Sequence, residues 1–172
     1  MNQRAHTTID SPVGPLTLVA RDGVLCGLYM VEQRHRPGGE AFGRPDATVF
    51  AEATEQVQEY FAGRRTGFDV PMAFIGTEFQ QRVWRALRHI PYGQTRSYGQ
   101  IAEKIGSPAA SRAVGAANGR NPISVIIPCH RVVGSTGHLT GYGGGLERKQ
   151  LLLAFEQDVV SGRHLDHRVP VS

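Results

Sequence analysis

The sequence contains little cysteine: of its 172 residues, only Cys26 and Cys129 carry a thiol. Cys26 lies in an apolar stretch, whereas Cys129 stands between a proline and a histidine. These unlike surroundings argue against a disulfide framework of the kind that holds small secreted proteins together. The second cysteine and the scattered histidines match no zinc-ligand spacing, so we expect no metal site.

Long hydrophobic runs are also missing from the sequence. No stretch is typical of a membrane span, and residues 1–10 are polar, so we expect a cytoplasmic protein that does not associate with a membrane. Hydrophobic residues make up 40% of the chain and charged residues 20%, as in an ordinary globular protein. The net charge of +4 permits binding to a polyanion without requiring it.

The N-terminal part has the alternation and the turn residues of β-hairpins. Short strands are predicted at 7–9, 15–19 and 24–29, joined by glycine-containing turns at 11–14 and 21–23. These strands predict a small antiparallel sheet.

A loop and a helix are expected to follow this sheet. The stretch 32–46 is rich in proline, glycine and charge, and we expect it to be a loop with no structure of its own. A helix is then predicted from Phe50 to Phe61, with Gly63 as its stop.

The pattern changes near Ile75-Gly76, where we place a domain boundary. Thr77 followed by Gln80 is the signature of a capping box and predicts a new helix, which ends before Pro91. We therefore expect an N-terminal structural domain over 1–75, a C-terminal domain over 76–158 and a flexible tail over 159–172. The fold class is α+β: a small antiparallel sheet with a helix, packed on a mostly helical C-terminal domain.

Two short helices joined by a tight turn predict a helix-turn-helix in the C-terminal domain. The first spans Tyr98 to Ile105 and is followed by Gly106; the second spans 109–118, with Ser107-Pro108 as its start. The second helix consists almost entirely of small side chains, with Arg112 among them. In an arbitrary helix such residues only permit close packing, but here they favour a helix that approaches a minor groove by shape.

A second group of chemically informative residues surrounds Cys129. Residues 124–127 form an apolar, β-branched run that predicts a short strand leading to Cys129, with Pro128 at its end. Most cysteines after such a run are inert, but His130 is a potential base. Side chains of neighbouring residues in an extended backbone point to opposite faces, so a bridging water or a bend would have to connect the two.

Residues further along the chain could support this pair. Glu156, near the end of a helix predicted over 147–155, could orient His130; alternatively, it is a solvated helix terminus. The turn at Asn121-Pro122 could tie the nearby backbone. A glycine-dense loop around Tyr142, over 134–145, could bring backbone amides close to a flat ligand, and it does not match a phosphate-binding loop.

Together these residues resemble the O6-alkylguanine-DNA alkyltransferases, also called methylated-DNA–protein-cysteine methyltransferases. The resemblance runs from about Thr77 to Glu156, and the N-terminal part is compatible in size and pattern. Its most specific motif is Pro128-Cys129-His130-Arg131, preceded by Asn121-Pro122. Supporting motifs follow the family's order: Pro91-Tyr92-Gly93, Ser97-Tyr98, Arg112-Ala113-Val114-Gly115 and Tyr142-Gly143-Gly144.

The resemblance implies direct-reversal DNA repair, in which an alkyl group passes from O6 of guanine, and from O4 of thymine, to Cys129. His130 would deprotonate the thiol through a water, with Glu156 orienting the histidine and Asn121 tying the active-site turn. Tyr98 would assist the departing guanine. Residues implied in DNA binding, with Arg112 filling the gap left by the extruded base, are Arg112, Ser97, Ala113, Gly115, Ala116 and Asn118. Residues implied in the base pocket are Tyr142, Gly143, Gly144, Ser124 and Val132.

The implied reaction needs no cofactor, and each molecule acts once because a thioether has no hydrolytic exit. The implied partner is double-stranded DNA containing O6-alkylguanine, bound by a protein that is monomeric in solution; cooperativity on DNA stays open. Ser124 stands where some relatives have proline and Gly143 where some have serine, and the N-terminal zinc site of some relatives is missing. Two alternatives are a module that binds damaged guanine without accepting its alkyl group, and a cysteine hydrolase that turns over.

Overall fold

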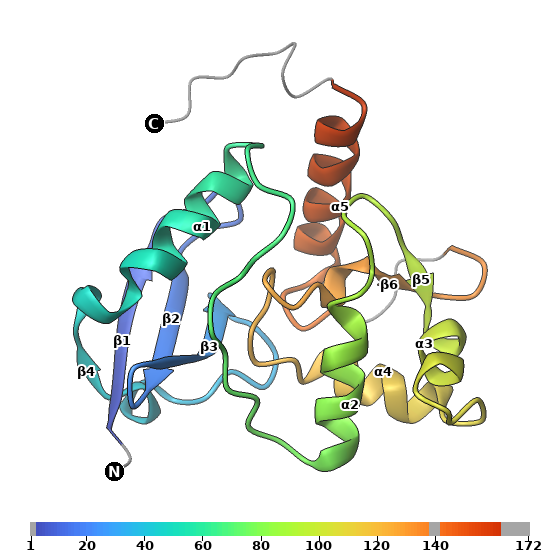
Figure 1. Cartoon of the computed structure of the whole chain (residues 1–172), viewed down its shortest axis with the longest axis horizontal. Helices are drawn as coiled ribbons and strands as arrows, with labels where there is room; N and C mark the ends of the chain where they lie inside the picture. Colours follow the sequence, from blue (N-terminus) through green and yellow to red (C-terminus); the bar gives the residue numbers. More distant parts are fainter. Residues whose placement is uncertain (1–2, 138–141, 163–172) are drawn as a thin grey trace.

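The computed structural model describes residues 3–137 and 142–162. In Figure 1 the sheet and the first α-helix lie together on the left, and the mostly helical C-terminal half lies on the right. The sheet order is β3-β2-β1-β4. Its strands are β1 (Arg4–Ile9), β2 (Leu16–Arg21), β3 (Val24–Met30) and β4 (Arg44–Pro45). The predicted strands and hairpin turns are confirmed, and Gly14 and Gly23 have the positive φ values that these turns need. The sheet is mixed rather than purely antiparallel, because β4 pairs in parallel with β1.

The predicted loop over 32–46 is wrong in part, because this stretch contains β4 and the 3₁₀ helix η1 (Gly39–Phe42). Its order comes from Phe42, which is 4% exposed and stacks on Tyr29 with ring centroids 5.6 Å apart. The guanidinium of Arg36 lies over the Phe42 ring, 5.2 Å from its centroid. A small apolar cluster on the outer face of the sheet therefore fixes a segment whose composition is typical of a loop.

The helix α1 (Ala51–Phe61) follows a short 3₁₀ helix η2 (Ala47–Phe50) and ends before Gly63, as predicted. It buries Ala53, Val57 and Tyr60 in the main core of the protein. Residues from the sheet, from α1 and from the C-terminal helices belong to this one core. The side chain of Tyr60 thereby lies deep inside the molecule, at the end of α1 that faces the C-terminal half.

The C-terminal half is mostly helical. Its elements are α2 (Glu78–Leu87), β5 (Arg96–Ser97), α3 (Tyr98–Lys104), α4 (Ser111–Gly119), η3 (Cys129–Arg131), β6 (Val132–Val133) and α5 (Leu146–Val160). The predicted capping box of Thr77 and Gln80 is confirmed, and a second one, formed by Ser97 and Gln100, begins α3. None of the helices in the described part of the chain is long and apolar enough to cross a membrane.

The helix-turn-helix is present, with α3 ending before Gly106 at φ 79°. Its second helix begins at Ser111, later than predicted, because Ser107 and Ala110 close a turn in which the Ala110 amide donates to the Ser107 carbonyl at 2.9 Å. The small side chains of α4 let it pack closely on α2, where the indole of Trp84 donates to the Ala117 carbonyl at 2.9 Å.

The predicted strand over 124–127 is wrong. Val125 has φ 72°, a left-handed value that a β-branched residue rarely adopts, and the Ile126 amide donates to the Ser124 carbonyl at 2.8 Å. This tight turn is attached to the edge of the N-terminal sheet, because the Leu28 amide donates to the Pro122 carbonyl at 2.8 Å. The end of the predicted tail, 163–172, and loop residues 138–141 lie outside the described residues.

Candidate active site

Asn121 holds the turn that precedes the cysteine. Its Oδ1 accepts from the Ile123 amide at 3.0 Å, and its Nδ2 donates to the Ile127 carbonyl at 2.8 Å. Asn121 is 3% exposed, so these bonds are not in competition with solvent. The predicted tie of the backbone by this side chain is present, and it stabilises the left-handed conformation of Val125.

Cys129 lies in the interior, at the start of η3 rather than at the end of a strand. It is 3% exposed, and burial raises the pKa of its thiol to about 11. Interactions with Asn121, Lys149 and Tyr142 act in the opposite direction. In this state of the protein the thiol is therefore protonated near neutral pH, and it needs a base and a nearby positive charge to become a nucleophile.

Lys149 is a buried charge beside the thiol that the sequence analysis missed. It is 0% exposed on α5, and burial lowers the pKa of its ammonium group to about 8, whereas the negative charge of an ionised Cys129 acts in the opposite direction. The sequence contains one signal for this lysine, which is its spacing along the helix. The buried side of α5 is formed by Lys149, Leu152 and Glu156, each about one helical turn from the next.

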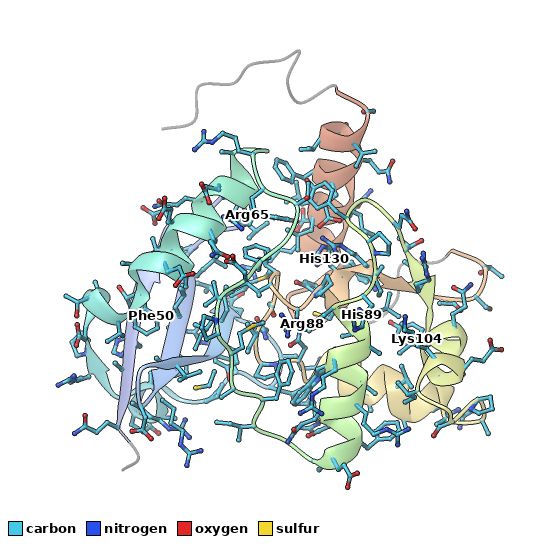
Figure 2. All side chains as sticks on the ribbon, in the orientation of Figure 1. Phe50, Arg65, Arg88, His89, Lys104 and His130 are labelled. Atoms are coloured by element: carbon cyan, nitrogen blue, oxygen red, sulfur yellow. The ribbon has the colours of Figure 1, made fainter. Side chains whose placement is uncertain are left out.

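His130 lies in the middle of the molecule beside α5 (Figure 2). It is 0% exposed, and its Nε2 is 2.7 Å from Oε2 of Glu156. Because an ionised carboxylate can only accept, Nε2 carries the proton and donates, which leaves Nδ1 as an acceptor in the neutral ring. Nδ1 is buried and has no hydrogen-bond partner among the described residues. Burial lowers the pKa of His130, although Glu156 opposes the shift.

Glu156 is the acceptor at the centre of this site. Its carboxylate accepts from His130, from the hydroxyl of Tyr60 at 2.7 Å, and from the Gly93 amide at 3.1 Å. Arg131 donates to it twice, at 2.9 and 3.0 Å. Burial alone would raise the pKa of this carboxyl, but His130 and Arg131 outweigh it and hold the pKa well below its ordinary range.

The position of Glu156 decides between the two interpretations of this residue. It is 0% exposed and lies inside α5, which continues to Val160, so it is not a solvated helix terminus. The predicted end of this helix at residue 155 is wrong for the same reason. Glu156 and His130 are brought together as expected, whereas Tyr60, Gly93 and the buried role of Arg131 were not foreseen.

Comparison with known proteins identifies the family to which the chain belongs. The family model of the 6-O-methylguanine DNA methyltransferase DNA-binding domain matches residues 78–158, and that of the family's ribonuclease-like domain matches residues 5–74. The chain belongs to the 6-O-methylguanine DNA methyltransferase family.

Individual members of the family are similar over nearly the whole chain. The methylated-DNA–protein-cysteine methyltransferase of Mycolicibacterium paratuberculosis is 57% identical over 88% of this chain and 92% of its own. That of Methanosarcina acetivorans is 49% identical over 88% and 97%. A crystal structure of Mycobacterium tuberculosis OGT in complex with DNA superimposes with a TM-score of 0.86 at 55% identity, covering 90% of this chain and 94% of that one.

On this member of the methyltransferase family, α4 presents Arg112, Ala113 and Ala116 to solvent. Gly115 faces the ring of Tyr98, because a Cβ at this position would lie 3.7 Å from its Cδ1. Ser97 is half-buried and caps α3 by accepting from the Gln100 amide at 3.1 Å. These residues therefore share the region of the helix-turn-helix.

Asn118 is an exception among the residues implied in DNA binding. It is 2% exposed, and its Nδ2 donates to the Cys129 carbonyl at 3.3 Å. The expectation that its side chain contacts DNA is therefore wrong for this conformation of the methyltransferase. The physical reason is that Ala117 and Asn118 lie on the inner side of the last turn of α4, which packs against the active-site turn.

The residues implied in the base pocket divide into two groups. Tyr142, Gly143 and Gly144 line a surface cleft of about 500 Å³ together with Glu32 and Arg34. At Gly144 a Cβ would lie 2.5 Å from the sulfur of Met30, so no side chain fits there.

Ser124 and Val132 do not line this cleft. Ser124 is 2% exposed and donates to Oε1 of Gln33 at 3.2 Å, and Val132 is 0% exposed in β6. Within the part of the chain that the structure describes, no group of three or more His, Cys, Asp or Glu side chains could hold a metal ion.

Proposed function

We propose that this protein repairs DNA by removing the alkyl group from O6 of a modified guanine in duplex DNA and keeping it on Cys129. The observation that carries the proposal is the pairing of His130 with Glu156 beside Cys129, in a chain of the 6-O-methylguanine DNA methyltransferase family. The pairing leaves Nδ1 of His130 free of protein partners among the described residues and able to accept a proton.

The reaction moves one proton and one alkyl group. The Cys129 thiol loses its proton to Nδ1 of His130 through an intervening water, and the charges of Lys149 and Glu156 stabilise the resulting thiolate and imidazolium. The thiolate attacks the alkyl carbon in line, so that a carbon–sulfur bond forms as the carbon–O6 bond breaks. The electron pair stays on the guanine, where Tyr98 stabilises the developing charge. Since the thioether has no hydrolytic exit, each molecule acts once.

The base has to leave the helix to reach the sulfur, because Cys129 lies 3% exposed in the protein interior. The exposed small residues of α4 favour a close approach to the minor groove, with Arg112 occupying the gap in the duplex. Access to the thiol also requires that the residues that cover it move, and Tyr142, which interacts with the Cys129 sulfur, also lines the surface cleft shared with Gly143 and Gly144. O4-alkylthymine is a second substrate of the same chemistry.

The test is the stoichiometry of transfer from duplex DNA that contains O6-methylguanine. We expect one methyl group per protein, found by mass spectrometry on the Cys129 peptide, and no transfer by a Cys129→Ser variant. Cys26→Ser is the matched control and should transfer normally, because Cys26 lies on the N-terminal sheet. An unmodified Cys129 peptide would support a binding module, and product beyond one equivalent would support a hydrolase.

A further inference from the structure

The buried hydroxyl of Tyr60 reaches the active site from the N-terminal half of the chain. It donates to Oε2 of Glu156 at 2.7 Å, across 96 residues of sequence. The same oxygen accepts from Nε2 of His130 at 2.7 Å and from Nη2 of Arg131 at 3.0 Å. Tyr60 and His130 thus share one acceptor atom, although the proposed reaction gives Tyr60 no part in the chemistry.

Tyr60 is held as a donor. It is 0% exposed, and burial together with the neighbouring Glu156 charge raises the pKa of its hydroxyl well above its ordinary value. Its ring packs against Phe155 at 5.6 Å and against Phe61 at 4.9 Å between centroids. The position of the oxygen is therefore fixed by contacts that do not involve the oxygen itself.

We propose that Tyr60 is a positioning residue that limits the pull of Glu156 on the proton of His130. A hydrogen bond to a carboxylate oxygen takes up part of its negative charge, so each donor on Oε2 weakens the attraction of that oxygen for the others. The N-terminal half thereby adjusts the basicity of the imidazole that receives the thiol proton. The inference rests on the proposed function for the role of His130 as the base, but its test measures the His130 proton directly and does not need alkyl transfer.

The other charged and titratable groups around His130 remain in place when the hydroxyl is removed. They are Arg131 on η3, and Lys149 and Glu156 on α5. Tyr92, in the loop before β5, interacts with Glu156 and Arg131. Arg131 and the Gly93 amide still bind Oε1 of Glu156, so the carboxylate keeps its position. A change in His130 can then be assigned to the Tyr60 hydroxyl.

The experiment uses the full-length protein, free of DNA, with ¹⁵N-labelled histidine. In Tyr60→Phe, which keeps the ring, we expect the Nε2–H proton of His130 to move downfield because its bond to Glu156 becomes stronger. We also expect the pKa of His130 to rise by about 0.5 to 1 unit. An unchanged or upfield resonance would overturn the proposal, since a merely structural tyrosine changes the stability of the protein and not this signal.

Tyr92→Phe is the matched control, because it removes a buried hydroxyl that has no hydrogen-bond partner among the described residues and whose ring lies 6.1 Å from that of Tyr60. It should leave the His130 resonance in place. A second measurement does not depend on whether Tyr60→Phe folds. All tyrosines are replaced by fluorotyrosine, whose hydroxyl donates a stronger hydrogen bond, and we expect the His130 resonance to move upfield. A resonance that does not move would overturn the proposal. Loss of methyl transfer to Cys129 would refute the proposed function without affecting these results.

Discussion

Arg131 binds Glu156 through one edge of its guanidinium, donating from Nε to Oε1 at 2.9 Å and from Nη2 to Oε2 at 3.0 Å. The third nitrogen, Nη1, donates to the Ile90 carbonyl at 2.8 Å. A two-point bond of this kind fixes the plane of the carboxylate as well as its position. His130 is therefore oriented by an acceptor that is itself held rigidly, which is what a buried base requires.

Replacing Glu156 by glutamine should impair both catalysis and stability. The amide can no longer balance the charges of Arg131 and of protonated His130, so we expect transfer to slow by about 10²- to 10⁴-fold. We also expect the free energy of unfolding to fall by about 3 to 5 kcal/mol, because a buried charge loses its partner. Single-turnover transfer and urea unfolding measure the two effects.

The control for this variant is Glu59→Gln. Glu59 pairs with Arg65 at 2.9 Å, but the two side chains are 31% and 28% exposed. Its loss should cost less than about 1 kcal/mol. Equal costs for the two variants would contradict the assignment of a buried, fully engaged carboxylate at Glu156.

The stability of the protein should fall as the pH is lowered from neutral. The folded state holds the pKa of His130 below its ordinary value, so stability is lost as the pH falls below the unfolded value of about 6.5. It also holds the pKa of Glu156 well below its ordinary range, so a further loss begins below the unfolded value of about 4.3. Urea unfolding at a series of pH values from 7 to 3 measures both steps. The lower step should be missing in Glu156→Gln, and its survival there would assign it to another carboxylate.

The elements that the sequence predicts well are those fixed by nearby residues. The capping box at Thr77 and the stop at Gly106 depend on side chains and dihedral angles within one helical turn. The run 124–127 has the composition of a strand, yet Val125 is forced into a left-handed turn by Asn121 and by pairing with β3. Such contacts override local preference and leave no local signal.

The same distinction applies to the site. Cys129 and His130 are adjacent in the chain and belong to one specific motif, so the sequence was sufficient to find them. Glu156 could be proposed as their support, but its burial could not, because that depends on how α5 packs. The contact of Tyr60 with Glu156 spans 96 residues and has no pattern of its own in the sequence.

Replacing Lys149 by methionine should make the Cys129 thiol harder to ionise. The positive charge of Lys149 lowers the pKa of the thiol, and methionine keeps most of the buried volume without the charge. We expect the midpoint of the pH profile of single-turnover transfer to rise, with the rate below the midpoint falling about tenfold for each unit of the shift. Lys104→Met removes the same charge from an exposed position on α3 and should leave the midpoint in place. A midpoint that is equal in the two variants would contradict the role of Lys149.

Replacing Arg112 by alanine should separate recognition of duplex DNA from the chemistry at the sulfur. Arg112 is exposed on α4, whereas Cys129 is buried, so the change should leave reaction with free O6-methylguanine nearly unaffected. Extrusion of a base costs a few kcal/mol of stacking energy, which Arg112 offsets in part by occupying the gap. Losing about 1.4 kcal/mol of this offset slows transfer from duplex DNA about tenfold. Rates on duplex DNA and on the free base, measured on the same preparation, give the ratio.

The matched variant for this ratio is Arg120→Ala, at the exposed C-terminal end of the same helix. Both variants lose one positive charge, so both weaken general attraction to the phosphate backbone and share its dependence on salt. At high salt the general attraction to the phosphate backbone is small, so only Arg112→Ala should still slow transfer from duplex DNA. If the two variants lose activity equally under these conditions, Arg112 acts as one surface charge among several and does not occupy the gap in the helix.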